Sequence, residues 1–292
     1  MTGDGGRGER RDIAYQVLLE LATLLRPYEG KVVIIGGWSA YFLTHNRAEP
    51  GFGQSHVGSS DVELMLAIPG LTRDEVLQIR AILIDAGYRP LVETRRPFSL
   101  ERSLDGNTSR RVLVDLMAPD TDPPSQQKVV ERGLWVILLD GGELARRYSI
   151  PVQFEGALPD GSEASAGMQV TDFPAFITLK GLALGDRRVK GPPEAFAKHA
   201  YDIACVLYAC GPETVALSLQ AALAAETGRS HELMERAISE IAAAFRSRDA
   251  GGAEAAATVF TSSDPLLMPS FTTQSFEAAA AFLRPLGYEV QR

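Results

Sequence analysis

The sequence predicts an α+β protein in which a mixed sheet with helices is followed by an all-helical part. Short β-branched runs alternate with helical patterns in the first part of the chain, and Pro- and Gly-rich segments follow at 118–125 and 156–167. From Thr171 onward, alanine- and leucine-rich patterns at helical spacing predominate. This order is typical of two domains. We therefore predict an α+β domain over 1–160 and a helical domain over 161–292.

The composition argues against a membrane protein and against non-specific nucleic-acid binding. The 292 residues are 45% hydrophobic, enough for one sizeable core or two modest ones, but no apolar run approaches the roughly 20 residues of a membrane span. The N-terminus is polar and lacks the apolar stretch of a signal peptide. With 29 basic and 37 acidic residues, the net charge of −8 repels a phosphate backbone. We expect a cytoplasmic protein without a membrane partner.

The N-terminal elements follow from hydrophobic spacing. Apolar residues at every third or fourth position predict helices, β-branched runs predict strands, and Gly and Pro mark the turns between them. In order, the pattern predicts a helix over 12–27, a strand over 31–35 closed by Gly36-Gly37, a helix over 38–44, a loop over 46–60, a strand over 61–68, a helix over 72–86 capped by Gly87, and an antiparallel pair of strands over 88–104 and 110–117 joined around Asp105-Gly106-Asn107.

The C-terminal part is expected to contain helices only. Their predicted positions are 172–185, 193–209, 213–226, 230–246 and 273–284. The domain boundary is expected between about 155 and 170. Cys205 and Cys210 lie on one of these helices and are too few for a disulfide scaffold or a zinc site. We interpret them as small core residues.

Three acidic residues stand in predicted strands. Because side chains alternate along a strand, Asp61 and Glu63 emerge on one face while Val62, Leu64 and Leu66 point to the other. Asp115 lies on the polar face of the strand that contains it, and if the two strands are neighbours the three acids converge. Adjacent carboxylates repel each other unless a cation lies between them. Mg²⁺ accepts this kind of oxygen ligand together with substrate phosphates.

The Gly36-Gly37 turn is a candidate phosphate site. A strand that ends in two glycines and opens a helix presents bare backbone amides and a helix N-terminus, and both attract a phosphate. The hydroxyl of Ser39 adds a donor. The structural alternatives are that the acids decorate the solvent face of their strands and that the two glycines form only a tight turn.

The order of these motifs resembles the nucleotidyltransferase superfamily with the polymerase-β-type fold. Its signature has three parts. The first is a hydrophobic residue followed by Gly-Gly or Gly-Ser, and the second is Asp-h-Asp-h or Asp-h-Glu-h, where h is hydrophobic. The third is a further acidic residue on a later strand. Gly36-Gly37, Asp61-Val62-Glu63-Leu64 and Asp115 in Val-Leu-Val-Asp-Leu match this signature. The resemblance implies that Asp61, Glu63 and Asp115 bind Mg²⁺, and that Gly36, Gly37 and Ser39 hold the phosphates of an NTP.

The helical half is similar to the toxins of the AbiEii type, which are nucleotidyltransferase-like members of type IV toxin–antitoxin and phage-defence systems. Lys180 lies in Phe-Ile-Thr-Leu-Lys-Gly-Leu, and Lys198-His-Ala-Tyr-Asp202-Ile matches the toxin motif except that His199 replaces its usual first aspartate. The resemblance covers about residues 30–210. It implies a catalytic or triphosphate-binding role for Lys180, an NTP-binding role for Lys198 and Asp202, and an antitoxin as partner.

The residues of this helical half also have structural interpretations. Lys180 shares a helical stripe with Phe173, Phe176 and Ile177. It either extends to solvent along this apolar surface or projects into a cleft between the domains. Lys198 and Asp202, four residues apart on one helical face, also fit a surface ion pair.

We therefore expect a Mg²⁺-dependent nucleotidyltransferase that transfers NMP from an NTP to a hydroxyl group, with its active site in a cleft between the two domains. Mg²⁺ lowers the pKa of the acceptor hydroxyl and neutralises the departing pyrophosphate. Asp115 acts as general base or metal ligand. The resemblance implies that the acceptor is a tRNA 3′ end or a protein side chain.

Two alternatives remain open. The first is a small-molecule nucleotidyltransferase of the aminoglycoside type, which an acidic groove would favour, whereas a basic rim of Arg95, Arg96, Arg110 and Arg111 would favour RNA. The second is a non-catalytic nucleotide-binding or interaction module that retains only the fold, and the replacement by His199 favours this alternative.

Overall fold

The computed structural model of the protein describes residues 5–47, 56–67, 70–91, 96–104, 110–120, 127–131, 134–260 and 265–291. The chain forms two compact units. We call Met1–Ser39 with Val57–Thr171 the sheet unit, and Ala40–His56 with Asp172–Arg292 the helical unit. The fold is α+β, as predicted. The division differs from the predicted boundary at 160. The chain first enters the helical unit after Ser39 and returns to the sheet unit after His56. It leaves the sheet unit for the second time only after Thr171.

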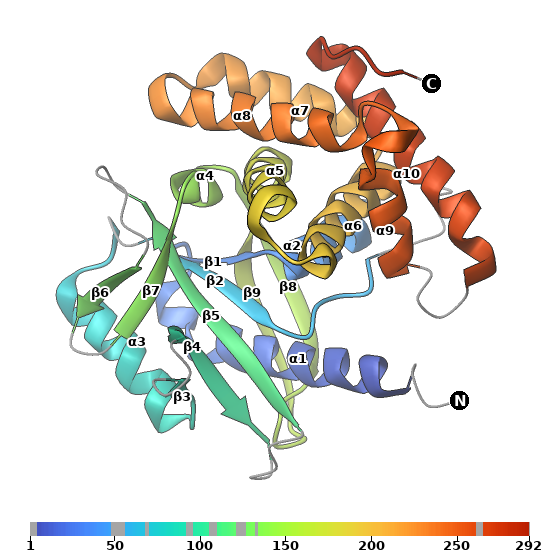
Figure 1. The fold of residues 1–292 in the computed structure, drawn as a ribbon. Helices are drawn as coiled ribbons and strands as arrows, with labels where there is room; N and C mark the ends of the chain where they lie inside the picture. The colour runs from blue at the N-terminus through green and yellow to red at the C-terminus, as the bar shows by residue number, and fades with distance from the viewer. Residues whose placement is uncertain are drawn as a thin grey trace. The chain divides into compact units, whose positions relative to one another are not determined.

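The sheet unit contains all the strands that the structure describes (Figure 1). Its elements are α1 (Gly5–Leu24), η1 (Arg26–Tyr28), β1 (Val32–Ile35), the start of α2 (Gly37–Asn46), β2 (Val62–Leu66), α3 (Arg73–Asp85), β3 (Arg89–Leu91), β4 (Arg96–Ser103), β5 (Arg111–Pro119), β6 (Gln127–Glu131), β7 (Leu134–Leu139), α4 (Gly142–Arg147), β8 (Ser149–Ala157) and β9 (Glu163–Thr171).

One mixed sheet organises this unit. Its strand order is β3-β4-β5-β2-β1-β9-β8, and β7 with β6 extends from the end of β5. β2 is antiparallel to β1 and parallel to β5, and β4 is antiparallel to β5. The expected pairing of 88–104 with 110–117 is therefore confirmed for β4 and β5. The turn expected at Asp105-Gly106-Asn107 lies outside the described residues.

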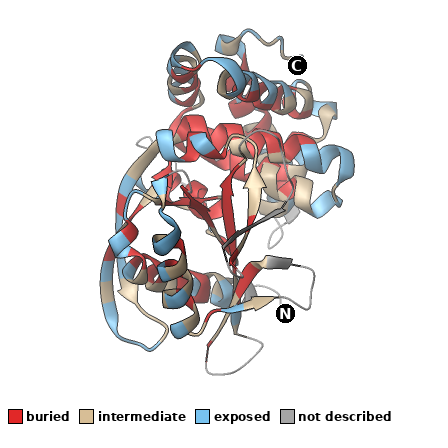
Figure 2. Cartoon of the chain, turned by 90° about the vertical axis from the view of Figure 1, so that its left-hand side faces the viewer, coloured by how far each residue is buried: buried red, intermediate tan, exposed pale blue. Residues whose placement is uncertain are grey.

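The alternation of the two central strands is also confirmed. Val62 and Leu64 of β2 and Val112, Val114 and Leu116 of β5 are all buried, as the strand pattern predicts. In Figure 2 the middle of the sheet is correspondingly coloured as buried. Since the apolar residues occupy one face, the polar residues of both strands share the other.

The hairpin of β8 and β9 was not predicted. It pairs continuously from Ser149 with Thr171 to Ala157 with Glu163, across the Gly-rich segment 156–167 that we interpreted as a domain boundary. Gly161, at a φ of 84°, belongs to its turn. β9 also pairs in parallel with β1, so this segment is part of the sheet. Glycine punctuation marks a hairpin turn as strongly as it marks a linker, and only the pairing partner distinguishes them.

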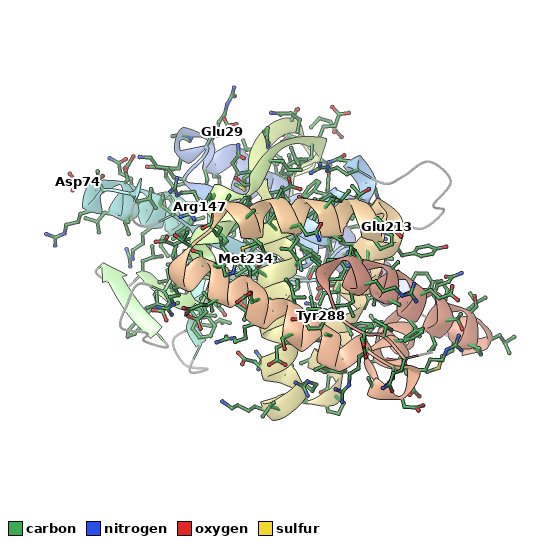
Figure 3. The ribbon with its side chains drawn as sticks, turned by 90° about the horizontal axis from the view of Figure 1, so that it is seen from above. Glu29, Asp74, Arg147, Glu213, Met234 and Tyr288 are labelled. Atoms are coloured by element: carbon green, nitrogen blue, oxygen red, sulfur yellow. The ribbon has the colours of Figure 1, made fainter. Side chains whose placement is uncertain are left out.

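The helical unit consists of the rest of α2 together with α5 (Phe173–Lys190), α6 (Pro193–Cys210), α7 (Pro212–Ala225), α8 (Gly228–Phe245), α9 (Gly252–Phe260), α10 (Met268–Leu283) and the short turns η4 (Arg248–Ala250), η6 (Pro265–Leu267) and η7 (Arg284–Leu286). The five predicted helices are present, and α9 is additional. Figure 3 labels Glu213 in the first turn of α7 and Met234 on α8. Met234 is completely buried, as is expected for the apolar face of an amphipathic helix.

Two expectations about the helical unit can be compared with the structure. Cys205 and Cys210 are free and buried, which confirms them as core residues. Among the described residues no single helix meets the length and hydropathy of a membrane span, and α6 with α7 meets them only as a pair bent by 104°.

Candidate functional site

The turn between β1 and α2 is built around Gly36. Gly36 has a φ of 75°, in the left-handed region that side chains other than glycine rarely adopt, and α2 begins at the next residue. Ile35, directly before the turn, is the register partner of Glu63 on β2. The strand, diglycine turn and helix predicted from the sequence are thus confirmed, and they place the helix N-terminus beside the acidic strand.

A row of three polar residues crosses the sheet next to this turn. Glu63 on β2 is the register partner of Asp115 on β5, and Asp115 is in turn the partner of Ser99 on β4. Register partners on adjacent strands project from the same face. Asp115 is only 9% exposed and Ser99 is fully buried, whereas Glu63 is partly exposed. The two acidic strands are therefore neighbours, which was the condition for the predicted convergence.

The two carboxylates of this row have different neighbours. Glu63 lies against Gly36, so closely that a Cβ atom on Gly36 would overlap its carboxylate. Asp115 accepts a hydrogen bond from the hydroxyl of Ser99, on the opposite side.

The expected convergence of all three acids is not observed. Asp61 lies directly before β2, is partly exposed, and its backbone N–H donates a long hydrogen bond of 3.5 Å to Ser59. In the part of the chain that the structure describes, no three His, Cys, Asp or Glu side chains gather closely enough to hold a metal ion. Glu63 and Asp115 are the two acids that the sheet register itself brings together.

The Ser39 hydroxyl, which was predicted to bind a phosphate, is buried and already hydrogen-bonded within the sheet unit. Ser39 is fully buried, and its hydroxyl donates to the carbonyl of Ile34 and accepts from Thr171, at 3.0 and 2.8 Å. The hydroxyl hydrogen of Ser39 is therefore used in a hydrogen bond between the start of α2 and β1. A buried hydroxyl needs such partners, and Ser39 finds them within the sheet unit.

Lys180, Asp202 and His56 form a buried ionic cluster within the helical unit. The ammonium of Lys180 on α5 lies 2.5 Å from Asp202 Oδ2, and His56 Nε2 lies 2.8 Å from Asp202 Oδ1. The three side chains are 5%, 1% and 2% exposed. Burial acts to raise the pKa of Asp202, but Lys180, His56 and Lys198 together outweigh it and hold that pKa well below its ordinary value.

This cluster changes the interpretation of Lys180 and Asp202. Lys180 neither extends to solvent nor projects into an open cleft, because its charge is held by Asp202. Asp202 is almost completely buried and so cannot form a surface ion pair with Lys198. Lys198 itself is partly exposed, and its NTP-binding role stays a prediction. The geometry of Lys180 and Asp202 gives them a structural role, since each neutralises a charge that would otherwise be buried alone.

Sequence reasoning missed two residues of these arrangements. His56 has no acid or cysteine at metal-ligand spacing in the sequence, and its partner Asp202 is 146 residues away. Ser99 lies within a predicted strand but carries no motif of its own. Neither residue has a local signal, since each acquires its partner only through tertiary structure or strand register.

Of the four arginines that were expected to form a basic rim favouring RNA, Arg110 and Arg111 lie near acids, and Arg102, which precedes them in the sequence, is paired as well. Arg102 makes two hydrogen bonds to the carboxylate of Glu20, Arg111 contacts Glu101 at 3.1 Å, and Arg110 lies 4.0 Å from Glu9. Arg95 and the side chain of Arg96 lie outside the described residues. Paired arginines present little net charge to a phosphate backbone.

Comparisons of the chain with protein-family models, with curated proteins and with solved structures give no match.

Proposed function

We propose that the protein is a nucleotidyltransferase that transfers NMP from an NTP to a hydroxyl acceptor. One observation carries the proposal: Glu63 and Asp115 are register partners on adjacent strands, and Glu63 lies against the Gly36 turn at the start of α2. This juxtaposes a pair of carboxylates with a helix N-terminus, the two features that bind a metal–phosphate group. The resemblance described above supplies the reaction and adds Asp61.

The donor set fits Mg²⁺. Mg²⁺ is usually bound through one or two carboxylates and completes its shell with water and substrate phosphates, so two neighbouring acids on rigid strands suffice. Glu63 and Asp115 would hold the ion. The resemblance adds Asp61 as a third acid, although in the described part of the chain Asp61 does not gather with the other two. When bound, Mg²⁺ would neutralise phosphate charge and lower the pKa of the acceptor hydroxyl.

The remaining steps belong to residues of the chain. The backbone amides at Gly36 and Gly37 hold the β and γ phosphates at the helix N-terminus. For this, Glu63 rotates away from Gly36, because its carboxylate occupies the space directly beside that residue. Asp115 accepts the proton of the acceptor hydroxyl. No role in the reaction is required of Lys180, whose charge is neutralised by Asp202.

The resemblance assigns the acceptor to a tRNA 3′ end or a protein side chain, in a toxin-like protein with an antitoxin partner. A small cationic acceptor of the aminoglycoside type is the second candidate. It is favoured by the pairing of Arg102, Arg110 and Arg111 with acids and by the net charge of −8. An acidic surface attracts a polycation and repels RNA.

The proposal is tested by incubating the full chain with Mg²⁺, each of the four NTPs labelled at the α phosphate, and one class of acceptor at a time. The acceptors are total tRNA, lysate protein and a set of aminoglycosides. The label remains with the NMP and so identifies the acceptor. Transfer that is absent with every NTP and acceptor, despite nucleotide binding, would identify a non-catalytic module and overturn the proposal.

A further inference from the structure

We infer that Ser99 is a positioning residue that holds the Asp115 carboxylate for metal binding. The inference rests on the proposed function and deepens it. Ser99 is fully buried, lies on β4 directly opposite Asp115, and donates its hydroxyl hydrogen to Asp115 Oδ1. No sequence motif assigned a role to this serine.

The choice of partner is informative. A buried hydroxyl needs an acceptor, and other buried hydroxyls of this chain use uncharged oxygens: Ser39 donates to the carbonyl of Ile34, and Thr171 donates to the hydroxyl of Ser39. Ser99 instead donates to a carboxylate, in a hydrogen bond that the charge strengthens. The bond therefore restrains the one acid of the row that is nearly buried.

Ser99 contacts the Asp115 carboxylate from the edge of β5 opposite to Glu63. In the row across the sheet, Asp115 has Ser99 on one side and Glu63 on the other. The hydroxyl therefore holds the Asp115 carboxylate from β4, the strand on the opposite side of β5 from Glu63. A carboxylate fixed in this way is ready to bind a cation without first being ordered. Hydrogen bonds of this kind to metal ligands commonly change metal affinity or activity by about 10–100-fold when they are lost.

The experiment measures Mn²⁺ binding by electron paramagnetic resonance on the full chain without nucleotide, together with NMP transfer. The variants are Ser99→Ala, Ser99→Thr and, as a control, Thr171→Val, which removes another fully buried hydroxyl of the same sheet that donates to no carboxylate. We expect Ser99→Ala to weaken Mn²⁺ binding by about tenfold or more and to lower kcat with little change in KM. Ser99→Thr, which keeps the hydroxyl, should restore both, and Thr171→Val should bind Mn²⁺ like the wild type.

The outcomes separate this inference from the proposed function. If the wild type binds Mn²⁺ and transfers NMP but Ser99→Ala matches it in both assays, the role of Ser99 is overturned and the function stands. If the wild type binds Mn²⁺ but transfers no NMP, the proposed function is overturned. In that case the inference about Ser99 is still tested by whether Ser99→Ala binds Mn²⁺ more weakly than the wild type. A wild type that binds no Mn²⁺ overturns the inference. A loss of affinity in Thr171→Val equal to that in Ser99→Ala assigns the effect to general loosening of the sheet and also overturns it.

Discussion

Lys180 and Asp202 form an ion pair of 2.5 Å between α5 and α6, with both side chains almost completely removed from solvent. Two charges buried together contribute little net stability, because their attraction mainly offsets the cost of removing them from water. Removing one of them, however, leaves the other buried without compensation. The pair therefore constrains how α5 and α6 pack, and its energetic importance appears when it is broken.

Replacing Lys180 by Met should lower the free energy of unfolding by about 3–5 kcal/mol, because Asp202 is then buried beside His56 without its principal counter-charge. Urea denaturation of the full chain measures this. Lys190→Met, at the exposed end of the same helix, is the control and should change stability by less than about 0.5 kcal/mol. The double variant Lys180→Met/Asp202→Leu should recover part of the loss. If Lys180→Met were as stable as the control Lys190→Met, the structural role of the cluster would be contradicted.

The stability of the protein should fall at acid pH in part through Asp202. Its pKa in the folded protein lies below the ordinary value of 3.8, so its stabilising effect is complete above that pH and decreases as the pH falls below it. One such group contributes a slope of up to about 1.4 kcal/mol per pH unit. The free energy of unfolding of Asp202→Asn, measured between pH 2 and 6, should therefore be less pH-dependent below about pH 4. Parallel curves for variant and wild type would refute this.

Gly36→Ala should destabilise the sheet unit more than Gly30→Ala does. Both glycines have positive φ values, 75° and 81°, so an alanine costs about 1–2 kcal/mol of backbone strain at either position. Only at Gly36 would the added methyl group overlap a side chain, that of Glu63, whereas Gly30 has open space around it. In a double-mutant cycle, Glu63→Ala should remove the excess cost of Gly36→Ala. Equal costs at both glycines would show that Glu63 does not lie against the turn.

Asp61→Ala and Asp115→Asn should each abolish NMP transfer, with a loss of at least about 100-fold in kcat if these acids bind the metal or accept the proton. Circular dichroism should show an unchanged fold for Asp61→Ala, because Asp61 is partly exposed. Glu101→Gln, in the same sheet, is the control and should retain activity. A fully active Asp61→Ala variant would remove this acid from the site.

The two cysteines should not react with Ellman's reagent in the folded protein. Both are buried, and burial raises the pKa of the Cys205 thiol to about 12. The reactive thiolate is therefore scarce at pH 8 as well as inaccessible. Unfolding in urea should expose both thiols to rapid labelling. Fast labelling of the native protein would contradict the packing of α6.

Several features of the protein could be predicted from the sequence because they are local. The alternation of Val62, Glu63 and Leu64 defines the two faces of β2 before any partner strand is known. Gly36 and Gly37 mark the strand-to-helix turn through backbone conformation alone. Amphipathic spacing likewise indicates α5 to α8 and α10, since each buries one face whatever it packs against.

Other features were decided only by tertiary structure, for a common physical reason. The register of β4, β5 and β2 selects Ser99 and Glu63 as the neighbours of Asp115, and the strand residues themselves do not encode which row they will occupy. The packing of α5 and α6 with each other and with His56 buries Lys180 and Asp202, which the sequence presents as ordinary charged residues on amphipathic helices. A charge or a hydroxyl acquires its role from what surrounds it in space, and that depends on contacts between residues far apart in the chain.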